Sequence, residues 1–214
     1  GELGTEYVIE ILGTVKQRPD NMINKDLPLG EIEIEVEEYT VLNECDELPI
    51  PIDTEGLDIN EESRLKYRYL DLRRKRLSEN MKLRSDFIHA ARNALTKRDF
   101  TEVETPMLTK STKEGARDFI VPSRHHPGKF YALPQAPQQY KQLLMVAGVE
   151  RYFQFARCIR DEDLRADRGY EHTQIDLEMS FVEIEDVMGT VEEIVKESIL
   201  EVGGKLKDDK FPVS

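Results

Sequence analysis

The segment 155–178 combines the side chains of this chain that are best suited to chemistry. Two strand-like segments, 151–159 and 173–182, flank a loop crowded with arginines and carboxylates. The exit of the first segment places Arg160 and Glu162 at one end of the expected sheet. Arginine offers a rigid two-pronged donor to phosphate or carboxylate, and carboxylates bind an ammonium group. These residue types therefore fit a site that holds a zwitterionic amino acid beside an anionic phosphate.

The second segment alternates between apolar and polar side chains, as a strand with two different faces does. Its apolar face carries Ile175, Leu177, Met179 and Phe181, and its polar face carries Gln174, Asp176, Glu178 and Ser180. An edge strand with one solvated face gives the same alternation. The neighbouring Arg160, Glu162, Arg165 and Arg168 favour a binding site instead.

Composition limits the class of protein. The 214 residues allow one large domain, or one domain and part of another, and 39% hydrophobic residues can form a core. A net charge of −13 argues against a protein that coats nucleic acid through its overall field, although a local basic surface can still bind a polyanion. Cys45 and Cys158 are far apart, so we expect reduced thiols, no disulfide and no zinc site. No apolar run approaches the ~20 residues of a membrane span, so we expect a cytoplasmic protein without a membrane partner.

Three regions follow from turn signals and charge. Residues 1–45 hold two strands, at 6–16 and 31–42, in which isoleucine and valine alternate with glutamate. Residues 46–78 form a linker and hinge that begins with a proline-punctuated acidic stretch. The basic run within it is either a solvated helix face or a hinge that faces RNA. Residues 79–214 form the largest region.

This largest region mixes helices and strands without a regular βαβ alternation, which favours an antiparallel α+β sheet. We expect a helix over 79–98 capped by Ser78, a short strand over 100–103, and strands over 119–121 and 129–133. A second helix opens at Pro137, in its first turn, and closes at Gly148. A last helix over 184–202 stops at Gly203 and turns Val187, Val191, Ile194 and Val195 inward.

Five blocks of sequence then resemble one enzyme family, in the family's order. IRDEDLRADR followed by EHTQIDLE resembles motif 2 of class II aminoacyl-tRNA synthetases, in the form typical of bacterial aspartyl-tRNA synthetases. FTEVETPML resembles motif 1, and RLKYRYLDLRR resembles the hinge after the anticodon-binding domain. TKEGARDFIVPSR resembles the mobile loop that closes over aspartate, and FYALPQAPQQYKQLLM the segment that reads the amino acid. Residues 5–45 resemble the closing half of the family's OB barrel, so the likeness covers nearly the whole chain.

The resemblance implies an α+β fold: a class II antiparallel sheet with flanking helices, preceded by part of an OB-fold barrel. It implies ATP-dependent conversion of aspartate to aspartyl-adenylate, then transfer to the 3′ end of tRNA(Asp). Arg160 is the implied catalytic residue, gripping the ATP α-phosphate and the substrate carboxylate. For ATP and the acceptor end, the resemblance implies Arg160, Glu162, Arg165, Arg168, His172 and Gln174. For aspartate, it implies Glu114, Gln138, Arg160 and Asp176, with Lys141 on the side-chain carboxylate.

The resemblance also implies partners and departures. A homodimer is expected through residues 79–108, with Pro106 at its interface. Ala136 stands where the family commonly has serine, and His172 where it commonly has phenylalanine, which stacks on adenine. A neutral imidazole can also stack.

Motif 3, the carboxylates for Mg²⁺ and the first half of the barrel are expected outside this sequence. We therefore expect an internal fragment with little or no aminoacylation activity of its own. Three other interpretations stay open: a non-catalytic class II binding module, a sister synthetase for asparagine or lysine, and a purely structural piece of an assembly. The presence of Arg160, Glu162, Lys141, Gln174 and Asp176 disfavours the first.

Overall fold

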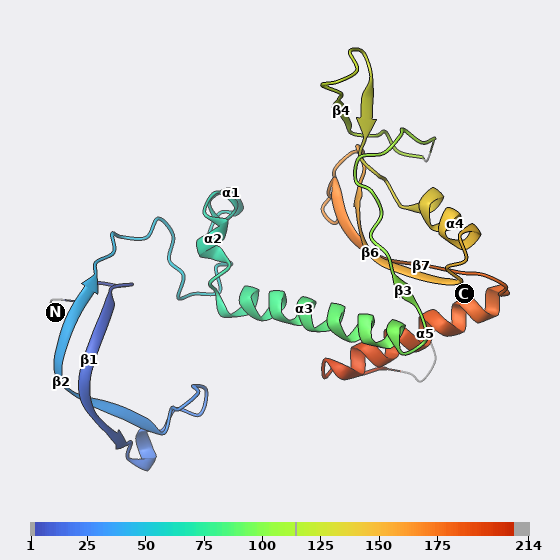
Figure 1. Cartoon of the computed structure of the whole chain (residues 1–214). Coiled ribbons are helices and arrows are strands. Elements are labelled where there is room, and N and C mark those ends of the chain that lie inside the picture. The colour runs from blue at the N-terminus through green and yellow to red at the C-terminus, as the bar shows by residue number, and fades with distance from the viewer. Residues whose placement is uncertain (1–2, 114, 208–214) are drawn as a thin grey trace. The chain divides into compact units, whose positions relative to one another are not determined.

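The computed structural model describes residues 3–113 and 115–207, and Figure 1 shows its elements. The chain divides into two units, Gly1–Ser78 and Glu79–Ser214. The long helix α3 (Lys75–Thr96) begins in the first unit and continues in the second. Each unit has its own set of strands, so we take them in turn.

The first unit begins with a long antiparallel hairpin. Its strands are β1 (Val8–Gln17) and β2 (Ile32–Asn43), with the 3-10 helix η1 (Asp20–Met22) in the connection. This confirms both strands expected from the alternation of isoleucine and glutamate. Two register shifts interrupt the pairing, and Figure 1 shows that the hairpin is strongly curved. Curvature and register irregularity are the devices by which a sheet bends toward a barrel.

The basic segment after the linker surrounds one buried carboxylate. Helix α1 (Glu61–Lys66) is followed by α2 (Arg68–Asp71), whose last residue, Asp71, has no exposed surface. Arg64 donates to Asp71 from Nε at 3.0 Å and Nη2 at 3.2 Å. Arg68 Nη1 and Arg74 Nε each donate at 2.7 Å. The Arg64 hydrogen bond, followed by that of Arg74, overcomes the cost of burial and lowers the pKa of Asp71 to about 2.

Arg74 also fastens the linker. Its Nη1 donates to the carbonyl of Thr54 and its Nη2 to that of Pro51, both at 2.7 Å. Gly56, at a φ of +73°, lies against this guanidinium, and a Cβ there would come within 2.5 Å of Arg74 Nε. Because Arg74 is only 2% exposed, it fits neither a solvated helix face nor a surface that faces RNA.

Helix α3 starts earlier than the sequence suggests. Ser78 was expected to cap it, but the backbone N–H of Ser78 donates to the carbonyl of Arg74 at 2.9 Å, so Ser78 lies inside the first turn. The buried side chain of Arg74 fixes the backbone just before Lys75, and this sets the helix start. The helix ends at Thr96, two residues before the predicted position.

The second unit is built on a three-stranded sheet. Strand β6 (Arg151–Ile159) lies between β3 (Thr101–Glu102) and β7 (Glu171–Met179), parallel to β3 and antiparallel to β7. The remaining elements are the hairpin of β4 (Ile120–Pro122) and β5 (Phe130–Ala132), and the helices α4 (Gln138–Val146) and α5 (Ile184–Glu201). The expected α+β fold is confirmed, although the short β3 pairs in parallel.

The apolar core of this unit lies on one face of the sheet. Phe153 packs there with Leu95, Phe100 and Ile194, and the core-facing side chains of β7 cover it: Ile175, Leu177 and Met179. One expectation is wrong: Val191 on α5 is 37% exposed and does not turn inward. The helix also buries Ser198, whose hydroxyl donates to the carbonyl of Ile194 at 2.6 Å.

Helix and strand ends also shift. Pro137 is the residue before the first turn of α4 rather than part of it. Strand β7 lies at 171–179 rather than 173–182, because the chain turns at Phe181, whose φ is +58°. Gly148 and Gly203 do end their helices, at φ values of +91° and +78°. Within the described residues, no helix is long and apolar enough to cross a membrane.

Replacing Asp71 by asparagine tests the arginine cluster. The variant leaves three guanidinium groups around a neutral amide, so we expect a loss of about 2 kcal/mol in the free energy of unfolding, measured by urea denaturation. Because the pKa of Asp71 is lowered, its stabilisation is present above pH 3.8 and disappears as pH falls towards 2. The difference between wild type and variant should shrink over that window.

The matched control is Asp86→Asn, which removes an exposed carboxylate from the surface pair with Lys82 on α3. Such a pair contributes about 0.5 kcal/mol or less. Equal losses in the two variants would contradict the structural role of Asp71.

Candidate active site

The second face of the sheet is polar and yet covered. The register of β6 and β7 places Gln154 opposite Asp176, and Tyr152 opposite Glu178. Tyr152, Gln154 and Asp176 are buried, and Asp176 is only 6% exposed. Helix α4 packs against both strands and contributes Lys141. The alternation in β7 therefore does not indicate a solvated edge strand, because the polar side chains of such a strand would be exposed to water.

Lys141 is the centre of the site. It is 8% exposed, so it is no surface lysine. Its Nζ donates to Asp176 Oδ1 at 2.9 Å and to the carbonyl of Leu177 at 3.4 Å, and lies 3.2 Å from Glu178 Oε2. Burial alone would lower the pKa of Lys141, but the hydrogen bonds and charges of Asp176 and Glu178 raise it above its usual value. The lysine is thus a fixed cation at every physiological pH.

Asp176 has one satisfied oxygen and one unsatisfied oxygen. Its Oδ1 accepts from Lys141 and, at 3.3 Å, from Gln174 Nε2. Its Oδ2 is buried and has no hydrogen-bond partner among the described residues. A buried carboxylate oxygen without a donor is costly, and it favours a bound donor such as an ammonium group.

A second group of hydrogen-bonded polar side chains lies beside the Lys141–Asp176 pair. The Tyr152 hydroxyl donates to Gln154 Oε1 at 2.8 Å, and Thr105 donates to the same oxygen at 2.9 Å. Burial raises the pKa of Tyr152 far above its usual value, and the charge of Asp176 adds to this rise. Tyr152 is therefore a neutral donor. Sequence reasoning missed Tyr152 and Gln154. The available signal was their even spacing from Arg160, because alternate residues of a strand point to the same face.

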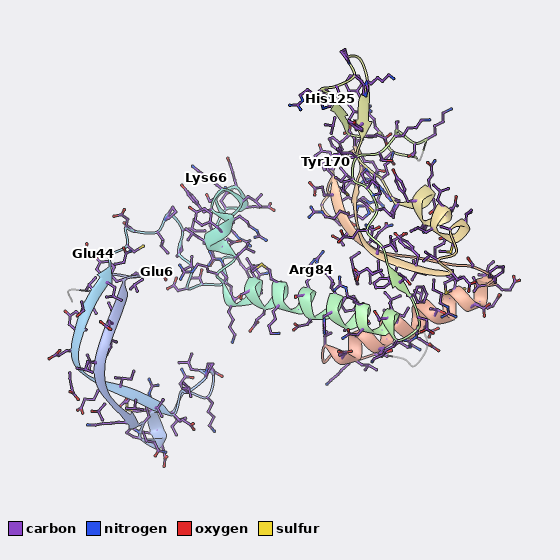
Figure 2. The ribbon with its side chains drawn as sticks, viewed as in Figure 1. Glu6, Glu44, Lys66, Arg84, His125 and Tyr170 are labelled. Carbon is purple, nitrogen blue, oxygen red and sulfur yellow. The ribbon has the colours of Figure 1, made fainter. Side chains whose placement is uncertain are left out.

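Arg160 lies where β6 enters its loop. Its backbone N–H donates to the carbonyl of Tyr170 at 2.8 Å, which closes the base of the loop. Its Nε makes a long hydrogen bond of 3.5 Å to the carbonyl of Gln135. The Tyr170 ring meets Phe119 edge-on at 5.5 Å between centroids, and Figure 2 labels Tyr170 at this end of the sheet.

The other predicted residues occupy more open positions. His172 lies opposite Cys158 on the polar face and is exposed, and Gln138 is exposed on the first turn of α4. The loop after β6 exposes Glu162, Arg165 and Arg168. Glu114 lies outside the described residues. The structure therefore joins Lys141, Gln174 and Asp176 by direct hydrogen bonds. His172 shares the polar face but lies further along β7, and Arg160 and the loop after it follow the end of β6 that is away from Tyr152.

No group of three or more histidine, cysteine, aspartate or glutamate side chains in the described part of the chain could hold a metal ion. Cys45 and Cys158 form no disulfide. The arrangement on the polar face can bind a molecule that carries both an ammonium group and carboxylates.

Comparison with known proteins identifies the family. The family model described as tRNA synthetases class II (D, K and N) matches residues 60–213. The chain belongs to the class II tRNA synthetase family. Among curated members, an aspartate–tRNA(Asp/Asn) ligase of Dictyoglomus turgidum is 56% identical over 210 residues, which are 98% of this chain and 35% of the relative. An aspartate–tRNA ligase of Exiguobacterium sibiricum is 53% identical over 208 residues, 97% of this chain and 35% of the relative.

Solved structures of the family share the fold. The asparaginyl-tRNA synthetase of Pyrococcus horikoshii, complexed with asparaginyl-adenylate, aligns with a TM-score of 0.79 and 28% identity, over 94% of this chain and 44% of that one. The Entamoeba histolytica asparaginyl-tRNA synthetase aligns with a TM-score of 0.72 and 24% identity, over 94% and 44%. The chain spans about a third of the length of the curated class II relatives.

Replacing Lys141 by methionine tests the buried pair. The variant keeps the volume but leaves Asp176 charged and unpaired, so we expect a loss of about 2–3 kcal/mol in unfolding free energy, moderated because Glu178 is 29% exposed to water. Lys82→Met, on the exposed face of α3, is the control. A loss in Lys141→Met no larger than that in the control would contradict the pairing.

Proposed function

We propose that the chain is the amino-acid-reading part of an aspartate–tRNA ligase. The observation that carries the proposal is the buried Lys141–Asp176 pair, in which Asp176 keeps one oxygen without a partner among the described residues. A cation and an unsatisfied carboxylate side by side match a ligand that brings its own ammonium group and its own carboxylate. Relatives that carry the name aspartate–tRNA ligase, at 53–56% identity, support aspartate as that ligand.

Binding would exchange the partners of this pair. The aspartate ammonium would donate to Asp176 Oδ2, with Gln138 and Glu114 as further contacts. The side-chain carboxylate of aspartate would take up the Lys141 ammonium group, which now contacts Asp176 and Glu178. Asparagine offers a neutral amide at this position and would leave the charge of Lys141 with its internal partners, so it binds less well.

Activation would then occur at the end of the sheet that carries Arg160. An oxygen of the α-carboxylate attacks the α-phosphorus of ATP, the bond to the bridging oxygen breaks, and pyrophosphate leaves. Arg160 would contact the α-phosphate and the carboxylate, and so balance the charge that grows on the phosphoryl oxygens. Gln174 would contact the reacting carboxylate, and Glu162 and His172 the adenine.

Transfer would follow at the same carbonyl. A ribose hydroxyl at the 3′ end of tRNA(Asp) attacks the aspartyl carbonyl, and AMP leaves with the electron pair of the mixed anhydride bond. Arg165 and Arg168, both exposed in the loop, would meet the phosphates or the acceptor end. Mg²⁺ would accompany ATP, with the carboxylate ligands that the family resemblance places outside this sequence.

We further propose the domain roles that the family resemblance implies. Residues 1–45 would belong to an OB-fold anticodon-binding domain, 46–78 to the linker and hinge, and 79–214 to the catalytic domain. Cys45 and Cys158 form no disulfide, which fits the cytoplasmic location that we propose.

Calorimetric titration with non-hydrolysable adenylate analogues tests this function. We expect the chain to bind the aspartyl analogue at least about tenfold more tightly than the asparaginyl analogue. Lys141→Met should abolish this preference while it still binds AMP, and Lys82→Met should behave as wild type. Equal binding of both analogues by the folded wild type would overturn aspartate as the substrate.

Sedimentation tests the proposed homodimer. Next to Pro106, Met107 is 39% and Leu108 is 54% exposed, so this segment presents apolar surface that a second copy could cover. We expect a species of about twice the 24.8 kDa chain mass, and a monomer for Leu108→Glu. Leu200→Glu, at an exposed position on α5, should remain dimeric. A monomeric wild type at high concentration would refute this interface.

A further inference from the structure

Three separate segments meet at the side chain of Gln135. This residue precedes α4 and is only 4% exposed. Its Oε1 accepts from the backbone N–H of Ala116 at 3.2 Å, and its Nε2 donates to the carbonyl of Ala116 at 2.9 Å. The glutamine amide thus pairs with Ala116 at both backbone groups, as a neighbouring strand would. Nε2 also donates to Asp118 Oδ1 at 2.5 Å.

Asp118 reinforces this junction. Its second oxygen accepts from the Ser111 hydroxyl at 2.5 Å, so one carboxylate ties Ser111 to Gln135. Burial raises the pKa of Asp118, but hydrogen bonds from Gln135, Ser111 and the Thr112 backbone lower it by more, to below its usual value. The carboxylate therefore stays charged, and its hydrogen bonds are of the stronger, charge-assisted kind.

The third segment is the end of β6 with Arg160. The N–H of Ile159 donates to the carbonyl of Pro134 at 2.9 Å, and the N–H of Asp161 donates to that of Arg117 at 3.0 Å. Arg160 Nε reaches the carbonyl of Gln135. Both neighbours of Arg160 in the sequence are thus held by backbone hydrogen bonds. Ile159 is bound to the segment that contains Gln135, and Asp161 is bound to the segment that the Gln135 amide contacts at Ala116. In Figure 1 the loop after β6 lies beside the base of the β4–β5 hairpin.

We propose that Gln135 is a positioning residue, which sets Arg160 relative to the amino-acid pocket on α4. This inference rests on the proposed function, because it takes Arg160 as the phosphate-binding group and Lys141 as the reader of the amino acid. Gln135 lies three residues before the start of α4, the helix that carries Lys141. Its side chain holds the backbone of Ala116, and the next residue, Arg117, accepts from Asp161. One amide thereby aligns the two halves of a site that must hold a single molecule.

Hydrogen exchange in the ligand-free chain tests directly whether the Gln135 side chain stabilises the backbone next to Arg160. Gln135→Met keeps the length of the side chain but removes the acceptor and the donor of its amide group. The Ala116 N–H loses its acceptor and should exchange at least about tenfold faster. The Asp161 N–H should also accelerate, although its own acceptor, the Arg117 carbonyl, is untouched. Amides in the β6–β7 ladder should keep their protection, and Gln142→Met, exposed on α4, should match wild type.

Acceleration at Ala116 alone, with Asp161 unchanged, would overturn the proposal. Should Gln135→Met also loosen the ladder, Asp118→Asn gives the same readout: it keeps Gln135 but removes the charge that receives Nε2. Faster exchange at both Ala116 and Asp161 in this variant supports the positioning role. Unchanged exchange at Asp161 contradicts it.

Titration separates positioning from general damage. Gln135→Met should weaken the aspartyl-adenylate analogue, which spans both halves, about tenfold more than it weakens aspartate and AMP measured singly. Equal weakening of all three ligands indicates a merely structural residue and contradicts the proposal. Failure of the wild type to bind any of them counts against the proposed function, whereas the exchange experiment still decides whether Gln135 positions Arg160.

Discussion

The second unit depends on one enclosed cation, Lys141, held between Asp176 and Glu178. A lysine from α4 can lie on the covered face of a sheet only if carboxylates replace the water that it loses. Strand β7 supplies both carboxylates at alternate positions, while the other face of β6 and β7 packs into the apolar core. The alternation of β7 therefore forms the core on one side and holds the charge of Lys141 on the other.

The two buried aspartates among the described residues differ in a way that separates a structural role from a binding role. Asp71 is surrounded by guanidinium donors on both oxygens, so nothing further is needed to satisfy it. Asp176 has donors on one oxygen, and its second oxygen is buried without a partner among the described residues. A buried carboxylate with donors on both oxygens stabilises the fold, whereas one with donors on a single oxygen favours a ligand that donates to the other oxygen. This contrast, and not burial itself, supports our proposal that Asp176 contacts the ligand.

Sequence reasoning succeeded where local rules dominate. Alternation of polar and apolar residues predicts the strand 151–159 and the polar face of its partner strand. The positive φ values that glycine permits predict the ends of α4 and α5. It failed where distant residues decide. Nothing near Arg74 in the sequence indicates that it will bind carbonyls at Pro51 and Thr54, and this burial moved the start of α3 away from Ser78.

The same limit applies to the site. Residue types and family resemblance named Lys141, Gln174 and Asp176, but not that Lys141 would be paired with Asp176 across 35 residues of chain. Tyr152, Gln154 and Gln135 were missed, because their importance comes from hydrogen bonds between separate strands and loops. Burial of a polar side chain is a property of the folded unit, and alternation alone cannot distinguish it from exposure to water.

The most direct test of this account is nitrogen-15 NMR of the lysine ammonium groups, with the Lys141 signal assigned by its loss in Lys141→Arg. The account predicts a slowly exchanging Lys141 signal in the ligand-free chain, because its Nζ is buried and hydrogen-bonded. Addition of the aspartyl-adenylate analogue should shift that signal as the ammonium group changes partners, and AMP alone should not. A Lys141 signal that exchanges as fast as exposed lysines, or that ignores the bound aspartyl analogue, would contradict the central claim.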